Sequence, residues 1–229
     1  MEEYHKINTI YKRDMANKKR LIEGDWSTPE FEYLQHNKWE FTEKVDGTNI
    51  RVKITRVANS CWVEYGGRTD AANIPPHLTE HLEETFPTYG PYRRDLMRPA
   101  FGKRHMDLLD WMLTKNLTDV VLYGEGFGPK IQQGEKYGDA VKFVLFDVKV
   151  GDWWLDRAGV EDVAKALDIP VVPVLGYGTL HDAVHWVKGD MGSKYGYFEA
   201  EGIVARPTVP MYTRKGERII AKIKCRDFK

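Results

Sequence analysis

One lysine followed by an Asp-Gly pair constrains this chain more than any other feature. Lys44 precedes Val45-Asp46-Gly47-Thr48-Asn49 and lies between two segments, 39–43 and 50–57, whose residues alternate as in strands. Asp-Gly between such segments is typical of a tight turn, so the sequence predicts a hairpin with Lys44 at its bend. Taken alone, the string fits an ordinary turn as well as a catalytic lysine. The amine of a lysine held there can attack a nucleotide phosphate.

Further motifs follow in a fixed order, each at the end or in the core of an apolar, strand-like run. They are Leu122-Tyr-Gly-Glu-Gly126, Phe143-Val-Leu-Phe-Asp147, Glu201-Gly-Ile-Val204 and Lys222-Ile-Lys224. Together with the segment around Lys44, this order resembles the covalent nucleotidyltransferases: ATP-dependent DNA ligases, RNA ligases and mRNA capping enzymes. The resemblance implies an α+β nucleotidyltransferase (ATP-grasp-like) fold of mainly antiparallel sheets with flanking helices and no OB-fold domain.

Length and composition agree with a globular enzyme. The chain has 229 residues, of which 42% are hydrophobic, and we expect a single adenylyltransferase domain over residues 1–229. The polar N-terminal segment and the absence of a long apolar run predict a soluble, cytoplasmic protein without membrane contact, in the host cytoplasm if it is viral. Two cysteines are too few for a disulfide scaffold, so we expect reduced thiols.

Periodicity predicts the elements between the motifs. Strands are expected over 61–65, 119–123, 141–150, 171–175, 202–206 and 218–224. Helices are expected over 76–84, 104–115, 160–167 and 180–188, and 87–99 is expected to be a loop. In the segment 50–57, Ile50, Val52 and Ile54 should share one face.

The resemblance assigns the phosphate chemistry to lysines. Lys44 is expected to attack the α-phosphate of ATP and to form a lysyl-AMP intermediate with release of pyrophosphate. Lys222 and Lys224 alternate with apolar residues in a strand pattern, so both can point to one face. Their charges are expected to stabilise the phosphate and to lower the pKa of Lys44.

The same resemblance assigns the remaining site residues. Glu125 is expected to bind the ribose and Phe146 to stack on the adenine, although a strand phenylalanine is also an ordinary core residue. Glu201 is expected to hold Mg²⁺, with Mn²⁺ as a substitute, although it also fits a surface glutamate at a strand end. The other expected nucleotide-binding residues are Glu43, Asn49 and Arg68, of which Arg68 contacts either the nucleotide or the nucleic-acid end.

Thr48-Asn49 indicates the branch of the superfamily. DNA ligases and capping enzymes usually have an arginine at the position of Asn49, whereas Gly47-Thr48-Asn49 resembles the RNA ligase 2-like branch, which seals 3′-hydroxyl and 5′-phosphate RNA ends. We therefore expect a monomer acting on RNA ends or a nicked duplex, with a separate protein supplying end recognition. The alternatives are a minimal DNA nick ligase or guanylyltransferase with the same lysine chemistry, and a non-catalytic nucleic-acid-binding remnant. The intact set of lysines and glutamates argues against the remnant.

Two further patterns have ordinary explanations. The histidine pairs His77/His81 and His181/His185 have helical i, i+4 spacing but lack a third ligand, which favours surface or packing roles over zinc. Residues 211–229 carry seven Lys and Arg against two acidic residues, although the formal net charge of the chain is zero. Within this basic segment, Arg214 and Lys215 fit either a solvated strand edge or an anion-binding surface.

Overall fold

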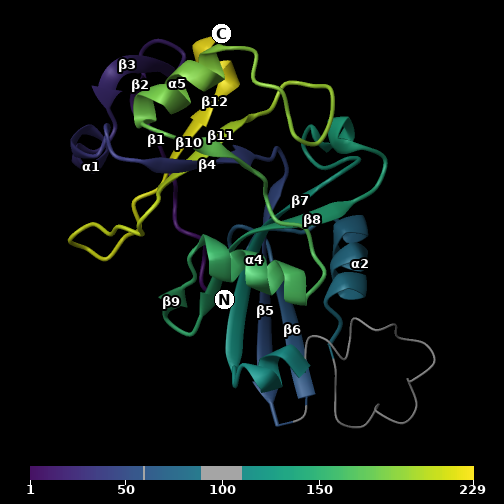
Figure 1. The fold of residues 1–229 in the computed structure, drawn as a ribbon. Coiled ribbons are helices and arrows are strands. Elements are labelled where there is room, and N and C mark those ends of the chain that lie inside the picture. The colour runs from purple at the N-terminus through teal and green to yellow at the C-terminus, as the bar shows by residue number, and fades with distance from the viewer. Residues whose placement is uncertain (59, 89–109) are drawn as a thin grey trace. The chain divides into compact units, whose positions relative to one another are not determined.

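The computed structural model describes residues 1–58, 60–88 and 110–229, which form two compact units (Figure 1). Unit 1 consists of Met1–Tyr4 and Asp46–Val171, and unit 2 of His5–Val45 and Val172–Lys229. The chain therefore crosses from one unit to the other between Val45 and Asp46, directly after Lys44. That the two units act as one adenylyltransferase domain stays a prediction.

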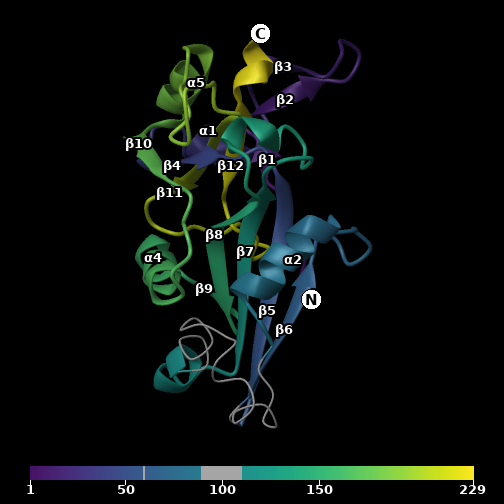
Figure 2. The ribbon, with the colours of Figure 1, turned by 90° about the vertical axis from the view of Figure 1, so that its right-hand side faces the viewer.

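Unit 1 contains a five-stranded antiparallel sheet in the order β6-β5-β7-β8-β9 (Figure 2). Its strands are β5 (Thr48–Val57), β6 (Ser60–Gly66), β7 (Asp119–Phe127), β8 (Lys142–Val150) and β9 (Trp153–Trp154). Ile50, Val52 and Ile54 are fully buried, which confirms the predicted apolar face of β5. This face packs against α2 (Pro76–Thr85) and α4 (Arg157–Ala166), and a short 3-10 helix, η2 (Gly134–Tyr137), follows β7.

Unit 2 contains a second five-stranded sheet in the order β1-β12-β11-β4-β10, in which only the β1–β12 pair is parallel. Its strands are β1 (Asn8–Thr9), β4 (Trp39–Lys44), β10 (Val174–Gly178), β11 (Gly202–Pro207) and β12 (Ala221–Lys224). The strands β2 (Tyr11–Asp14) and β3 (Arg20–Trp26) form a separate antiparallel pair. The helices of this unit are α1 (Pro29–Tyr33), α5 (Leu180–Lys188) and η3 (Cys225–Phe228).

The core of unit 2 lies between its sheet and α5. Leu180, Ala183 and Val187 pack with Phe41 and Ile203 in one buried cluster. The helix begins where its sequence predicts, because the Thr179 side chain accepts from the Asp182 amide and the Asp182 side chain accepts from the Thr179 amide. The predicted bounds of this helix are therefore confirmed.

The predicted hairpin around Lys44 is wrong. Strand β4 pairs with β10 and β11 in unit 2, whereas β5 pairs with β6 and β7 in unit 1. Position 47 nevertheless requires a glycine, because a Cβ atom there would lie 2.3 Å from the backbone oxygen of Gly126. The Asp-Gly pair thus allows a close approach to β7 instead of closing a hairpin.

Several other elements differ from the prediction. The predicted strand 119–123 continues to Phe127 through two glycines, and a Cβ atom at Gly124 would lie 2.2 Å from the Phe143 ring. Of the predicted helix 104–115, residues 104–109 lie outside the described residues, and 110–114 are helical. The predicted loop 87–99 also lies mostly outside them. None of the helices within the described ranges is long and apolar enough to cross a membrane.

Candidate active site

Strand pairing in unit 2 brings two of the predicted lysines into one row. Gly202, the first residue of β11, pairs with Lys44 of β4 on one side and with Lys224 of β12 on the other. A Cβ atom at position 202 would lie 2.0 Å from the carbonyl oxygen of Ile223, so a side chain here does not fit. Glycine therefore allows β11 and β12 to approach at the end of the sheet that carries both lysines.

Glu201 lies directly before this row and binds both lysines. Its Oε2 atom accepts a hydrogen bond from Lys44 Nζ at 2.7 Å, and its Oε1 atom accepts one from Lys224 Nζ. The side chain of Glu201 is only 7% exposed. Burial acts to raise the pKa of this carboxyl, but the charges and hydrogen bonds of Lys44 and Lys224 outweigh burial and hold the pKa below its usual value.

Lys222 lies on the same face of the sheet as Lys224. It pairs with Val204, which also pairs with Thr42 of β4, so the row of Lys222 and Thr42 lies two residues from the row of Lys224 and Lys44. Side chains two residues apart in a strand point to one face, as the alternating sequence predicts. Lys44, Lys222 and Lys224 thus place three cationic groups on a single face of unit 2.

Glu43 lies on the opposite face of β4 from Lys44. Its buried carboxylate accepts hydrogen bonds from Ser193 Oγ at 2.5 Å and from the Lys194 amide at 2.8 Å. The side chain therefore anchors the loop that precedes β11, and a role of Glu43 in nucleotide binding stays a prediction. The sequence did not identify Ser193 or Lys194 as its partners. The only available signal was that the Glu43 carboxylate, in a strand of buried residues, needs hydrogen-bond partners.

In unit 1, Asn49 and Glu125 are neighbours across the β5–β7 pair. Both are half-buried. The Asn49 Oδ1 atom is buried and has no hydrogen-bond partner within the part of the chain that the structure describes. A buried acceptor without a hydrogen-bond partner lowers the stability of the fold. A bound ligand that donates a hydrogen bond to this atom would remove that cost.

Phe146 lies at an irregularity of the β7–β8 pair. Tyr123 pairs with Asp147 and Gly124 with Leu145, so the register shift leaves Phe146 between them as an extra residue. Its half-buried ring lies edge-on to the ring of Tyr4, with 5.1 Å between the centroids. Tyr4 also donates a 2.8 Å hydrogen bond to the fully buried carboxylate of Asp147. Sequence reasoning missed Tyr4, which no local pattern connects to β8.

Arg68 is exposed and lies two residues after the end of β6, in a loop of unit 1 that a buried arginine organises. The Arg51 side chain has no exposed surface, and its Nε atom donates to the Gly67 oxygen at 2.6 Å and its Nη2 atom to Asp70 at 2.9 Å. Arg51 alternates in the sequence with the apolar residues Ile50 and Val52, a pattern that gives no sign of its burial. The contacts of Arg51 fix the backbone that presents Arg68.

No group of three or more potential His, Cys, Asp or Glu ligands occurs among the described residues. His181 contacts Gln35 at 2.8 Å, and His77 contacts the Pro129 oxygen at 3.1 Å. A site built by the protein alone, such as a zinc centre, is therefore not found in residues 1–58, 60–88 and 110–229. Mg²⁺ commonly binds through one or two carboxylates, water and substrate phosphates. Both oxygens of Glu201 bind lysines in the structure, and its role in holding a cation stays a prediction.

Solved structures of one enzyme share the fold. Three structures of Naegleria gruberi RNA ligase match this chain: a mutant without ligand, the enzyme with pyrophosphate, and a mutant with AMP and manganese. Their sequence identities to this chain are 17%, 18% and 16%, and their TM-scores are 0.59, 0.59 and 0.60. These matches cover 100%, 98% and 98% of this chain but only 59%, 58% and 56% of the Naegleria chains, so this chain spans less than two thirds of their length. A family model described as RNA ligase matches residues 37–224. This match includes every predicted site residue, and the chain belongs to the RNA ligase family.

Proposed function

We propose that this chain is the adenylyltransferase domain of an ATP-dependent RNA ligase that uses Lys44 as its nucleophile. The observation that carries the proposal is the shared binding of Lys44 and Lys224 to the two oxygens of Glu201. Lys44 is thereby held in one geometry on a central strand, beside a second cation and a carboxylate. Membership of the RNA ligase family supports the choice of RNA over DNA.

The first step forms a phosphoramidate. The Nζ lone pair of Lys44 attacks the α-phosphorus of ATP, the bond from that phosphorus to the bridging oxygen breaks, and pyrophosphate leaves with the electron pair. The amine attacks in its neutral form, so Nζ releases a proton to solvent before it attacks. In the structure, Lys44 Nζ forms an ion pair with the Glu201 carboxylate. Rearrangement of this ion pair is therefore part of activation.

Glu201 is the residue that would hold a divalent cation, Mg²⁺ or Mn²⁺, and the cation would supply charge neutralisation to the phosphates. Lys222 and Lys224 supply positive charge from the protein on the same face as Lys44. Such charges stabilise the negative charge that builds up on the phosphate oxygens in the transition state. The three lysines thus divide into one nucleophile and two stabilising cations.

Unit 1 supplies the residues for nucleoside recognition. Glu125 accepts hydrogen bonds from the ribose hydroxyls, and Asn49 beside it offers its Oδ1 atom, which has no partner among the described residues, as a further acceptor. The half-buried ring of Phe146 stacks on the adenine, and exposed Arg68 contacts the nucleotide or the nucleic-acid end. Phe146 already has an aromatic neighbour, Tyr4, which limits the orientations of its ring.

Two later steps join the strands. An oxygen of the RNA 5′-phosphate attacks the AMP phosphorus and Lys44 leaves, and the 3′-hydroxyl oxygen then attacks the activated 5′-phosphorus and AMP leaves. The substrates are RNA ends or a nicked duplex, and the protein acts as a monomer with a separate protein for end recognition. A DNA nick ligase with the same lysine chemistry is the alternative.

The mass of the intact protein after incubation with ATP or GTP and Mg²⁺ tests the first step. We expect one AMP per chain from ATP, acid-labile as a phosphoramidate is, and none in Lys44→Ala. Lys165→Ala is the matched control, because Lys165 is an exposed lysine of α4. An adduct on another residue, or one formed from GTP alone, would contradict the assignment.

Sealing rates on matched nicks test the substrate. We expect a nick with RNA on the 3′-hydroxyl side to be sealed faster than the all-DNA equivalent, because RNA-binding proteins read the 2′-hydroxyl and A-form geometry. Sealing should also slow steeply with added salt, since phosphate contacts release counterions. Equal or faster sealing of DNA would favour the DNA ligase alternative.

A further inference from the structure

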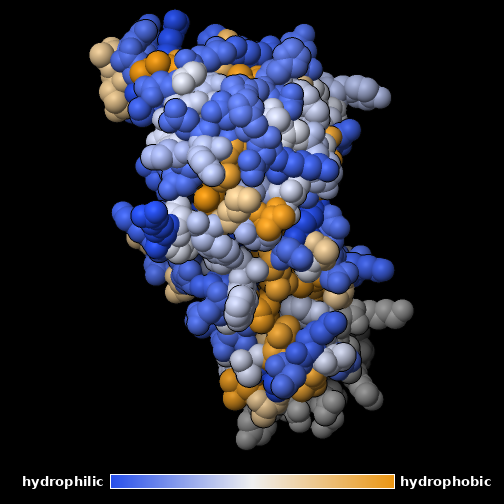
Figure 3. Space-filling view, turned by 60° about the vertical axis from the view of Figure 1, so that its left-hand side comes forward, coloured by the Kyte–Doolittle hydropathy of each residue, from blue (hydrophilic) through white to orange (hydrophobic). Residues whose placement is uncertain are grey.

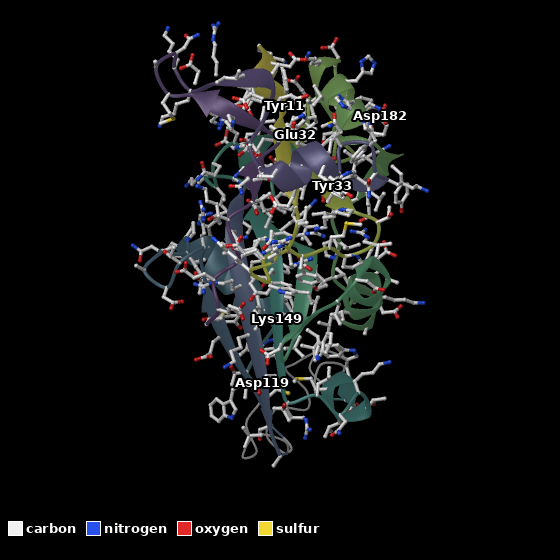
Figure 4. The ribbon with its side chains drawn as sticks, turned by 90° about the vertical axis from the view of Figure 1, so that its left-hand side faces the viewer. Tyr11, Glu32, Tyr33, Asp119, Lys149 and Asp182 are labelled. Carbon is white, nitrogen blue, oxygen red and sulfur yellow. The ribbon has the colours of Figure 1, made fainter. Side chains whose placement is uncertain are left out.

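An open pocket of about 470 Å³ in unit 2 shares no residue with the row of lysines. The residues Glu30, Tyr33 and Leu34 line it from α1 and the residue after it, and Met211, Tyr212 and Ile219 line it from the segment before β12. Figure 4 shows Tyr33 on this side of the molecule, projecting from α1. From a neighbouring angle, Figure 3 shows a mainly hydrophilic surface with separate hydrophobic patches.

The pocket combines exposed aromatic rings with an apolar floor. Tyr33 is 86% exposed and Tyr212 is 50% exposed, whereas Leu34 and Ile219 are buried. An exposed tyrosine contributes little to the stability of the fold, but a planar ligand can stack on the flat face of its ring. Proteins that bind single-stranded nucleic acid use such side chains to stack bases, without needing base pairing.

The segment that carries Tyr212 also carries basic residues. Tyr212 and Arg218 form an isolated antiparallel bridge, and the Thr213 amide donates to the Glu217 oxygen at 2.8 Å, so residues 212–218 form a small hairpin. Its turn contains Arg214 and Lys215, which are both exposed. Residues opposite each other in an antiparallel bridge share a face, so Arg218 lies on the same face as Tyr212.

We propose that this pocket binds an unpaired nucleobase of an RNA strand, stacked on Tyr33 and Tyr212, while Arg214 and Lys215 contact the adjoining phosphates. The proposal deepens the proposed function and rests on it for the identity of the ligand. The Glu30 carboxylate at the pocket can accept a hydrogen bond from the exocyclic amino group of adenine, cytosine or guanine. Uracil has no such group, so the pocket discriminates against it.

Fluorescence anisotropy with labelled oligo(A), oligo(C) and oligo(U) RNA, without ATP, tests the proposal. We expect oligo(A) and oligo(C) to bind more tightly than oligo(U). The Tyr33→Ala/Tyr212→Ala double variant should weaken oligo(A) binding at least about fivefold. Stacking of a base on one aromatic side chain raises the affinity by about this factor or more. The matching Tyr33→Phe/Tyr212→Phe variant keeps the rings and should bind as the wild type does.

The salt dependence separates stacking from phosphate contacts. Arg214→Gln/Lys215→Gln should reduce the slope of log K against log salt by about 1.4, at roughly 0.7 per lost contact with a single strand. The tyrosine variants should leave this slope unchanged. Tyr197→Ala is the control for loss of an exposed tyrosine, because Tyr197 is fully exposed and does not line the pocket.

Three results would overturn the proposal: unchanged oligo(A) binding in the tyrosine-to-alanine variant, an equal loss in Tyr197→Ala, or a change of oligomeric state in the tyrosine variants, which would assign the pocket to a second copy. Adenylylation with ATP alone is measured in parallel. Its absence in the wild type, with base-dependent RNA binding intact, would reject the proposed function and leave the pocket assignment standing.

Discussion

The Nζ atom of Lys44 lies 2.7 Å from the Oε2 atom of Glu201, whose other carboxylate oxygen binds Lys224. The carboxylate is therefore shared by two cations and is itself almost completely buried. Removing one of these three charged side chains leaves the charges of the other two incompletely neutralised, which is strongly destabilising when the charges are buried. The stability of unit 2 and the chemistry of its lysines are thus linked through Glu201.

Lowering the pH should expose this link. Because the pKa of Glu201 is lower in the folded chain than its usual value of 4.5, its contribution to stability is complete above about 4.5 and is lost as the pH falls through the folded-state pKa. We expect the free energy of unfolding of the wild type to fall more steeply below pH 4.5 than that of Glu201→Gln. Urea denaturation at pH 7, 5.5 and 4 measures this, and Glu199→Gln serves as the control because Glu199 is an exposed glutamate paired with Lys229. Parallel curves for wild type and Glu201→Gln would show that Glu201 is not responsible.

Replacing the stabilising lysines should slow formation of the AMP adduct. We expect Lys222→Ala and Lys224→Ala each to lower its rate by about 100-fold or more, as for loss of one charge-stabilising donor in a water-excluded site. Single-turnover kinetics with labelled ATP measures the rate, with Lys165→Ala as the exposed-lysine control. An equal effect of Lys165→Ala would attribute the loss to net charge.

Gly202→Ala should destabilise unit 2. The added Cβ atom would lie 2.0 Å from the Ile223 oxygen, so β11 and β12 must move apart at position 202. Lys44 and Lys224 pair with this residue on either side. We expect the free energy of unfolding to fall by about 1–3 kcal/mol, as in other overpacked sites. Gly192→Ala is the matched control, because nothing lies within 4 Å of a Cβ atom there. Similar losses in both variants would mean that the close approach is unimportant.

Asn49→Ala should separate stability from ligand binding. Since the buried Asn49 Oδ1 atom has no partner within the described ranges, its removal breaks no hydrogen bond of this atom. We expect an unchanged or higher free energy of unfolding without ATP, together with weaker stabilisation by ATP and a higher KM for ATP. Thermal unfolding with and without ATP checks both. A less stable variant with unchanged affinity for ATP would assign Asn49 a purely structural role.

Two variants of Tyr4 should have different effects. Tyr4→Phe removes the hydrogen bond to the buried Asp147 carboxylate but keeps the ring beside Phe146, so we expect a loss of about 1–3 kcal/mol in the free energy of unfolding and little change in KM for ATP. Tyr4→Leu also removes the ring that orients Phe146, and its KM for ATP should rise. If both variants have the same KM, the orientation of Phe146 does not depend on Tyr4.

The candidate site was partly predictable because its signals are local. Alternation within 221–224 is enough to place Lys222 and Lys224 on one face, and the capping residues Thr179 and Asp182 fix the start of α5. The partners of β4 were not predictable, because an Asp-Gly pair fits both a hairpin turn and a close approach to another strand. Tyr4 and Asp147 are 143 residues apart, and Arg51 is buried by contacts to Gly67 and Asp70, 16 and 19 residues further along the chain, which no local pattern connects to it.

The row of Lys44, Gly202 and Lys224 is built from paired strand backbone. Its spacing is therefore set by the pairing of the sheet strands, and the arrangement should last as long as this pairing does. As unit 2 is heated, the capacity to form the AMP adduct should persist almost unchanged and then disappear within the same narrow temperature interval as its β-sheet signal. Heating is thus expected to disrupt the lysine row together with the sheet of unit 2, without an earlier phase in which the active lysines alone lose their arrangement.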